Sequence, residues 1–237
     1  DFPFELFYVP LHIVSEKTEQ FINYKNKTAI VLPVIVKNQE FDDVCEKTKA
    51  LLERGFNGAV ISNAAFLGAF KGYNTYSGFR MNIFNSLSLN FLHNEGVKIA
   101  ELSPELNLKQ IKAMNKASAQ TAVMAYGRLG LMVSENCVLK NGGCCPCNKV
   151  GHITDRMGMV FPVIKDGNSC VNVVLNCKKT FTAHKIDEIF FSGIDFCRLY
   201  FSDEDETECK KVADAYLNKG TYMPSDFTNA HFYKGLV

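Results

Sequence analysis

The strongest constraint on the fold is a regular alternation of short apolar runs and amphipathic stretches through residues 1–128. The run 28–36 has the length and β-branched content of a buried strand, and stretch 39–54 repeats its apolar residues at helical spacing. Gly55 stands where a helix commonly ends. Strands that alternate with helices are typical of a parallel sheet. The pattern therefore predicts an α/β fold.

The same pattern predicts five strands and a sixth candidate near the N-terminus, at residues 28–36, 57–61, 79–83, 97–102, 121–126 and 6–14. Helices are expected at residues 39–54, 64–70 and 86–93, and a further helix is expected to open at Ser103-Pro104-Glu105. A closed barrel of this kind needs eight strands. The count therefore predicts a partial or truncated (β/α) barrel-like parallel sheet, with an open doubly wound sheet as the alternative.

Residues 129–237 differ from the first part of the chain in composition and in the pattern of apolar residues. Segment 128–152 is rich in glycine and cysteine and is predicted to be loop, and residues 153–164 are predicted to form a hairpin around a turn at 155–158. Strands at 171–175 and 196–201 and helices at 185–191 and 203–217 are expected to follow. We therefore expect two domains, a barrel-like βα domain over 1–128 and a small cysteine-rich α+β extension over 129–237.

The chain has nine cysteines, and several of them cluster in the extension. Thiolates brought together from neighbouring loops are the ligands that zinc and iron–sulfur clusters prefer. The candidate ligands are Cys137, Cys144, Cys147 and Cys170, with Cys145 as a substitute for Cys144. They predict a 4Fe–4S iron–sulfur cluster or a zinc ion in a cytoplasmic protein. A redox dithiol or plain buried cysteines are the alternatives.

Polar side chains also gather at the carboxyl ends of the predicted strands, where parallel α/β folds bind their ligands. Glu101 is the candidate catalytic base, and Glu105 is assigned to capping a helix. For the two arginines of the set, a surface salt bridge is an equal alternative. The candidate substrate-binding residues are Arg80, Asn82, Asn85, Tyr126 and Arg128.

Composition excludes several classes of protein. The formal net charge is +1, so no overall positive field attracts nucleic acid. No apolar run approaches the ~20 residues that a membrane span requires. Phosphate-binding glycine loops, dinucleotide fingerprints and zinc-protease helices are absent from the sequence. The chain does not begin with Met, and we expect an N-terminal remainder of the same polypeptide as its partner.

Four ordered motifs resemble the collagenase-like peptidase family of unknown catalytic type, peptidase family U thirty-two. The motifs lie at residues 82–86, 101–106, 126–132 and 155–158, and the cysteines follow in family order. The chain is most similar to the C-terminal segment of the long members. The resemblance implies a barrel-type fold with a cysteine cluster beside the final strand. In this resemblance Cys137 matches the family cysteine after the Tyr-Gly-Arg motif, while Ala122 stands where many members have glutamate.

The resemblance also implies function. Some members are named peptidases or collagenases, and others are iron–sulfur proteins that hydroxylate RNA bases or a quinone precursor. Three hypotheses follow: a metal or iron–sulfur protein acting in RNA-base hydroxylation, a metal-dependent peptidase that uses Glu101 as its base, and a non-catalytic module with structural zinc. RNA or peptide is accordingly the expected substrate.

Overall fold

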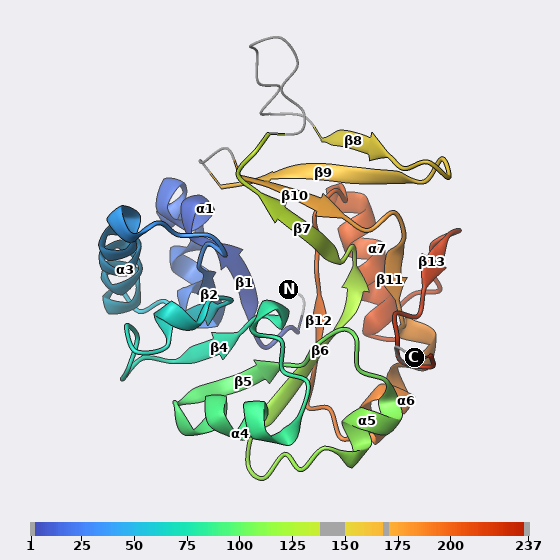
Figure 1. The fold of residues 1–237 in the computed structure, drawn as a ribbon, viewed down its shortest axis with the longest axis horizontal. Helices are drawn as coiled ribbons and strands as arrows, with labels where there is room; N and C mark the ends of the chain where they lie inside the picture. The colour runs from blue at the N-terminus through green and yellow to red at the C-terminus, as the bar shows by residue number, and fades with distance from the viewer. Residues whose placement is uncertain (1–2, 138–149, 168–170, 235–237) are drawn as a thin grey trace.

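A curled parallel sheet organises the molecule in this computed structural model, which describes residues 3–137, 150–167 and 171–234 (Figure 1). Its strands follow one another in chain order, and a late strand, β12, adds to β6 in parallel. This arrangement confirms the predicted α/β class and gives the sheet the form of a half-barrel. The parallel strands are β1 (Phe7–Pro10), β2 (Thr28–Val31), β3 (Gly58–Ile61), β4 (Thr75–Ser77), β5 (Val97–Glu101), β6 (Gln120–Gly127) and β12 (Phe196–Leu199).

Alternate residues along these strands face opposite sides of the sheet. On β3, Ala59 and Ile61 join the large outer core against the helices, whereas Val60 faces the inside of the curl with Ile99 and Ala122. All four residues of β3 are buried, as expected for a parallel sheet covered on both faces. The apolar runs of the sequence therefore place the main core between sheet and helices.

Helices connect the strands and cover the convex face. Asn85 begins α4 by accepting a hydrogen bond from the Ser88 backbone N–H, and Asp205 begins α7 in the same way at Glu208. Within the described ranges, no helix is long and apolar enough to cross a membrane. The helices are α1 (Leu11–Glu16), α2 (Thr18–Phe21), α3 (Asn38–Glu53), α4 (Ser86–Asn94), α5 (Leu108–Ala113), α6 (Ile186–Phe191) and α7 (Glu206–Tyr216), with 3-10 turns η1 (Ile22–Lys27), η2 (Ala64–Phe66), η3 (Phe79–Met81) and η4 (Ala183–Lys185).

A second, antiparallel sheet lies across one end of the curled sheet (Figure 1). Its strands run in the order β7-β10-β9-β8, and the predicted hairpin turn at 155–158 joins β8 to β9. Two short strands, β11 (Lys179–Phe181) and β13 (Phe227–Thr228), extend the first sheet beyond β6. The antiparallel strands are β7 (Gly130–Ser134), β8 (Gly151–Thr154), β9 (Val160–Asp166) and β10 (Val171–Leu175).

Three local predictions are wrong. Residues 79–81 form the 3-10 turn η3, ended by Asn82 in a left-handed conformation (φ 51°), and the strand lies just upstream as β4. Ser103 opens no helix: α5 begins five residues later, where Asn107 and Gln110 form a capping box. Part of segment 128–152, predicted to be loop, forms β7. The predicted domain boundary after residue 128 stays a prediction.

Candidate functional site

Glu101 ends β5 with its side chain inside the curl of the sheet. The residue is 1% exposed, and its Oε2 atom accepts hydrogen bonds from the Phe79 backbone N–H at 3.0 Å, Arg198 Nη1 at 2.6 Å and Tyr200 Oη at 2.7 Å. Ser77 Oγ on β4 accepts the backbone N–H of Glu101. Two segments, the η3 turn and the chain at the end of β12, therefore hold one carboxylate oxygen in place.

Arg198 supplies the positive charge of this centre. Its guanidinium carbon lies 4.3 Å from the ring centroid of Tyr8 on β1 and 4.1 Å from that of Tyr200. Burial acts to lower the pKa of Arg198, but the Glu101 carboxylate together with Tyr200 and Tyr8 outweighs this, so the pKa is raised and the side chain stays cationic. Tyr8 lies on β1 and Arg198 on β12, which are the first and last of the parallel strands. The curl of the sheet therefore brings these two outermost strands close enough for their side chains to touch.

Tyr200 depends on a close approach of two backbones. Gly127, at the end of β6, has a φ of 110°, and a Cβ atom at this position would collide with the Tyr200 carbonyl oxygen. Tyr200 N–H in turn donates to the Tyr126 carbonyl at 2.9 Å. Glycine at position 127 therefore lets the chain after β12 pass close enough to place the Tyr200 hydroxyl on Glu101.

The second oxygen of Glu101, Oε1, is buried and has no hydrogen-bond partner among the residues the structure describes. Burial raises the pKa of the Glu101 carboxyl, and the Arg198 cation and the bond from Tyr200 oppose that rise. A buried carboxyl with one pinned and one open oxygen can accept a hydrogen bond from a ligand or carry a proton. Glu101 is therefore the residue best placed for chemistry in the described interior.

Arg80 links this interior to the antiparallel sheet. Its Nη2 atom donates to the Gly130 carbonyl at 3.0 Å, and its guanidinium lies over the Phe79 ring at 5.1 Å. Burial raises the pKa of Asp166 at the end of β9, while His12 and Arg80 nearby lower it. Lys37 and Glu135 form an ion pair at 3.0 Å between the two sheets. Charged groups thus collect where the antiparallel sheet meets the carboxyl ends of the parallel strands.

The other predicted binding residues make contacts within the protein. Arg128 Nε pairs with Asp203 at 3.1 Å, and its Nη1 donates to the carbonyls of Asn176 and Cys177. The buried Tyr126 hydroxyl donates to Glu204. Asn85 caps α4, and Asn82 is exposed in its left-handed turn. None of these four contacts Glu101 in the described hydrogen bonds.

The predicted metal ligands are only partly described. Cys137 is a half-buried free thiol three residues after β7, while Cys144, Cys145, Cys147 and Cys170 lie outside the described residues. Across the ranges that are described, no group of three His, Cys, Asp or Glu side chains could hold a metal. Burial raises the pKa of Cys197 to about 12, which makes it an inert core thiol. The metal site therefore stays a prediction.

Sequence reasoning missed Arg198, Tyr200 and Tyr8. The available signal was a lone arginine inside the apolar run 196–201, which a strand buried on both faces accommodates only when the charge is paired. Ala122, where the resemblance expects glutamate, lies directly opposite Glu101 in the register of β5 and β6. In this chain the acidic residue at this pair of positions is therefore Glu101 on β5, and β6 has alanine there.

A half-barrel of parallel strands with a buried, charge-paired carboxyl at their carboxyl ends defines a barrel-type α/β protein with an interior site. The model of the family described as Peptidase family U32 matches residues 11–219, and the chain belongs to that family. No curated protein and no solved structure matches it.

Proposed function

We propose that this chain is the C-terminal segment of a metal- or iron–sulfur-dependent family member that acts in the hydroxylation of RNA bases. Cys137, Cys144 (or Cys145), Cys147 and Cys170 would hold the metal or cluster. An N-terminal remainder of the same polypeptide is the proposed partner. When bound, an iron–sulfur cluster supplies one-electron redox chemistry that side chains lack.

The observation that carries this proposal is the topology of the antiparallel sheet. Ser134 at the end of β7 pairs with Asn172, and Asp166 at the end of β9 pairs with Val171. Gly151, the first residue of β8, pairs with Val163 in the middle of β9, so β8 begins on its side nearer to Asp166. The described residues that flank the two cysteine-bearing connections, between β7 and β8 and between β9 and β10, therefore lie toward one end of one sheet, which supports a shared metal centre.

That end of the antiparallel sheet also lies near the carboxyl ends of the parallel strands. Asp166 lies there within electrostatic reach of His12 and Arg80, and Glu135 pairs with Lys37. A metal centre held by the sheet would therefore lie near the carboxyl ends of the parallel strands, the edge at which β5 ends in Glu101. In the enzyme that we propose, Arg198 and Tyr200 fix Glu101, and Glu101 accepts a hydrogen bond from substrate or holds a proton at Oε1.

Anaerobic purification followed by iron, sulfide and zinc analysis tests the proposal. We expect brown protein with charge-transfer absorbance, and loss of both metal and colour in Cys147→Ala and Cys170→Ala. Cys45→Ala and Cys209→Ala are matched controls, because these thiols lie on helices α3 and α7 and not in the connections of the antiparallel sheet. Colourless protein with one zinc per chain would instead identify a structural site, and metal-free protein would overturn the proposal.

A further inference from the structure

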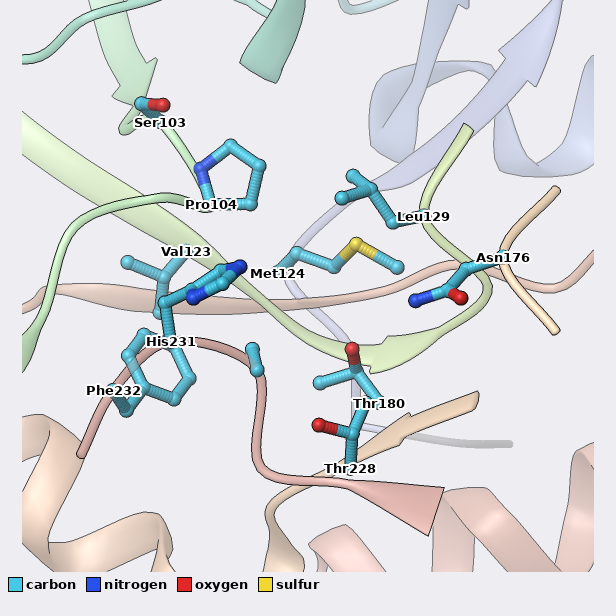
Figure 2. A pocket seen from close by; sticks show the side chains of 11 residues that line it. Ser103, Pro104, Val123, Met124, Leu129, Asn176, Thr180, Thr228, His231 and Phe232 are labelled. Carbon is cyan, nitrogen blue, oxygen red and sulfur yellow. The ribbon is translucent and has the colours of Figure 1, made fainter. Parts of the chain in front are cut away.

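A cavity of about 260 Å³ lies beside β6 (Figure 2). Met124 on β6, Ser103 after β5 and Asn176 after β10 line it from the body of the fold. His231 and Phe232 line it from the chain that follows β13. Residues 229–234, which we call the strap, therefore supply part of the wall of this cavity.

The strap begins at two residues that are held unfavourably. Ala230 has a left-handed backbone with a φ of 52°, a conformation that costs free energy for a residue with a Cβ atom. The Oδ1 atom of Asn229 is buried and has no hydrogen-bond partner among the residues that the structure describes. Both costs fall directly after Thr228, which pairs with Thr180 in the sheet. Asn229 and Ala230 thus have the character of a hinge that contacts further along the strap hold in place.

Contacts with helices α5 and α6 hold the strap closed. Phe232 is buried in the outer core, and its carbonyl accepts the Leu108 N–H at the start of α5 at 3.1 Å. The Tyr233 hydroxyl donates to Glu188 Oε2 on α6 at 2.7 Å. Lys185 Nζ lies 4.6 Å from the centroid of the Tyr233 ring and pairs with Glu188 at 3.0 Å. A buried anchor and a surface latch therefore follow the hinge.

The hinge and the anchor act against each other. Release of the strap takes Phe232 out of the core, which favours the closed state. Release also frees Ala230 from its left-handed conformation and lets the Asn229 oxygen bind water, which offsets part of that loss. The strap should therefore open at a lower free energy than the sheet behind it, where every residue of β3 is buried.

We propose that the strap opens about Asn229 and Ala230 while both sheets stay folded, and that this motion controls access to the cavity beside β6. In the closed state His231 and Phe232 complete the wall, and Met124 behind them is 4% exposed. In the open state solvent reaches Met124. The inference concerns a moving part of the fold, and it holds whichever metal or substrate the protein uses.

Amide hydrogen exchange at Leu108 in the purified full chain, followed by NMR, tests the motion, because this N–H donates to the Phe232 carbonyl. Tyr233→Phe removes the hydrogen bond of the latch and should accelerate exchange about fivefold. Ala230→Gly relieves the hinge, since glycine adopts a positive φ freely, and should slow exchange about threefold. The matched controls are Tyr24→Phe at an exposed tyrosine and Ala117→Gly at a φ of 46°, and both should leave exchange at Leu108 unchanged.

Oxidation of Met124 by dilute hydrogen peroxide, located by peptide mass spectrometry, tests access to the cavity. Met157, 81% exposed at the turn between β8 and β9, is the reference within the same chain. We expect Tyr233→Phe to speed oxidation of Met124 and Ala230→Gly to slow it, with Met157 unchanged in both. Oxidation of Met124 that neither variant changes would overturn the inference. Faster exchange in Tyr233→Phe that extends to the amides of β3 would do so as well, because the strap would then open only when the whole sheet unfolds.

Discussion

The two sheets of this protein bury their residues to different extents. In the curled parallel sheet, β3 is buried at every position and even a charged pair, Glu101 and Arg198, lies inside. In the antiparallel sheet β10 is largely buried, but Leu131 and Met132 on β7 are half-exposed, and residues along β8 alternate between half-buried and exposed. Burial on both faces stabilises the parallel sheet. The antiparallel sheet has more exposed residues, and its cysteine-bearing connections lie toward one end. The two regions should therefore respond differently to equivalent substitutions.

The largest difference is expected for arginine removal. Arg198→Met leaves the Glu101 carboxyl buried without its cation, and breaking a buried pair in this way costs about 3–5 kcal/mol. Arg156→Met, at the exposed turn between β8 and β9, should change stability by less than about 0.5 kcal/mol. Urea unfolding followed by circular dichroism measures both.

A double variant separates loss of the pair from loss of packing. Glu101→Gln combined with Arg198→Met removes both charges, so it should recover part of the stability that Arg198→Met loses. If the double variant is as unstable as the sum of the two single variants, the pair is not coupled and the electrostatic account of the interior centre is wrong.

The next effect in size is expected for leucine truncation. Leu102, just after β5, is 1% exposed in the outer core, so Leu102→Ala should cost about 2–5 kcal/mol. Leu131→Ala on β7 removes a side chain that is 49% exposed and should cost under about 1 kcal/mol. Similar losses at the two positions in thermal or urea unfolding would show that the antiparallel sheet is as tightly packed as the parallel one.

A smaller effect is expected in the pH dependence of stability. Burial raises the folded-state pKa of Glu101 above its ordinary value of 4.5. The folded state then binds the proton more tightly than the unfolded state does, so stability falls as pH rises above 4.5 toward the folded pKa. Glu101→Gln should remove this part of the slope. If parallel unfolding series of the two proteins between pH 4 and 8 show identical slopes, the carboxyl does not titrate with a raised pKa.

Periodicity predicted the framework of the parallel sheet well. The stretch 39–54 became α3, and the apolar runs became β2, β3, β5 and β6, because each period agreed with the burial that the sheet imposes. The errors came where local signals outweighed tertiary context. Ser103-Pro104-Glu105 has the composition of a helix start, yet Ser103 is 3% exposed against β6 and the capping box at Asn107 begins the helix.

The interior site was only half predictable. Position at the end of a strand identified Glu101, because that edge binds ligands in parallel sheets. The residues around it come from β1 and from the chain around β12. Tyr8 lies 93 residues before Glu101 in the sequence, and Arg198 lies 97 residues after it. No local pattern links such distant positions; only the curl of the sheet brings them together. Arg128, a candidate for substrate binding with a salt bridge as the equal alternative, pairs with Asp203 from a distant part of the sequence.

The smallest effect tests whether the antiparallel sheet opens locally. Asp155 Oδ1 accepts the backbone N–H groups of Met157 at 2.8 Å and Met159 at 2.9 Å, which fixes the turn between β8 and β9. Asp155→Ala should cost about 0.5–1.5 kcal/mol, and the loss should fall on the hairpin because few buried contacts tie its tip to the rest. Amide hydrogen exchange should therefore accelerate in β8 and the start of β9 while β3 and β6 keep their protection. Equal acceleration in β3 would mean that the two sheets unfold as one cooperative unit, and the contrast between them would then be one of exposure rather than of stability.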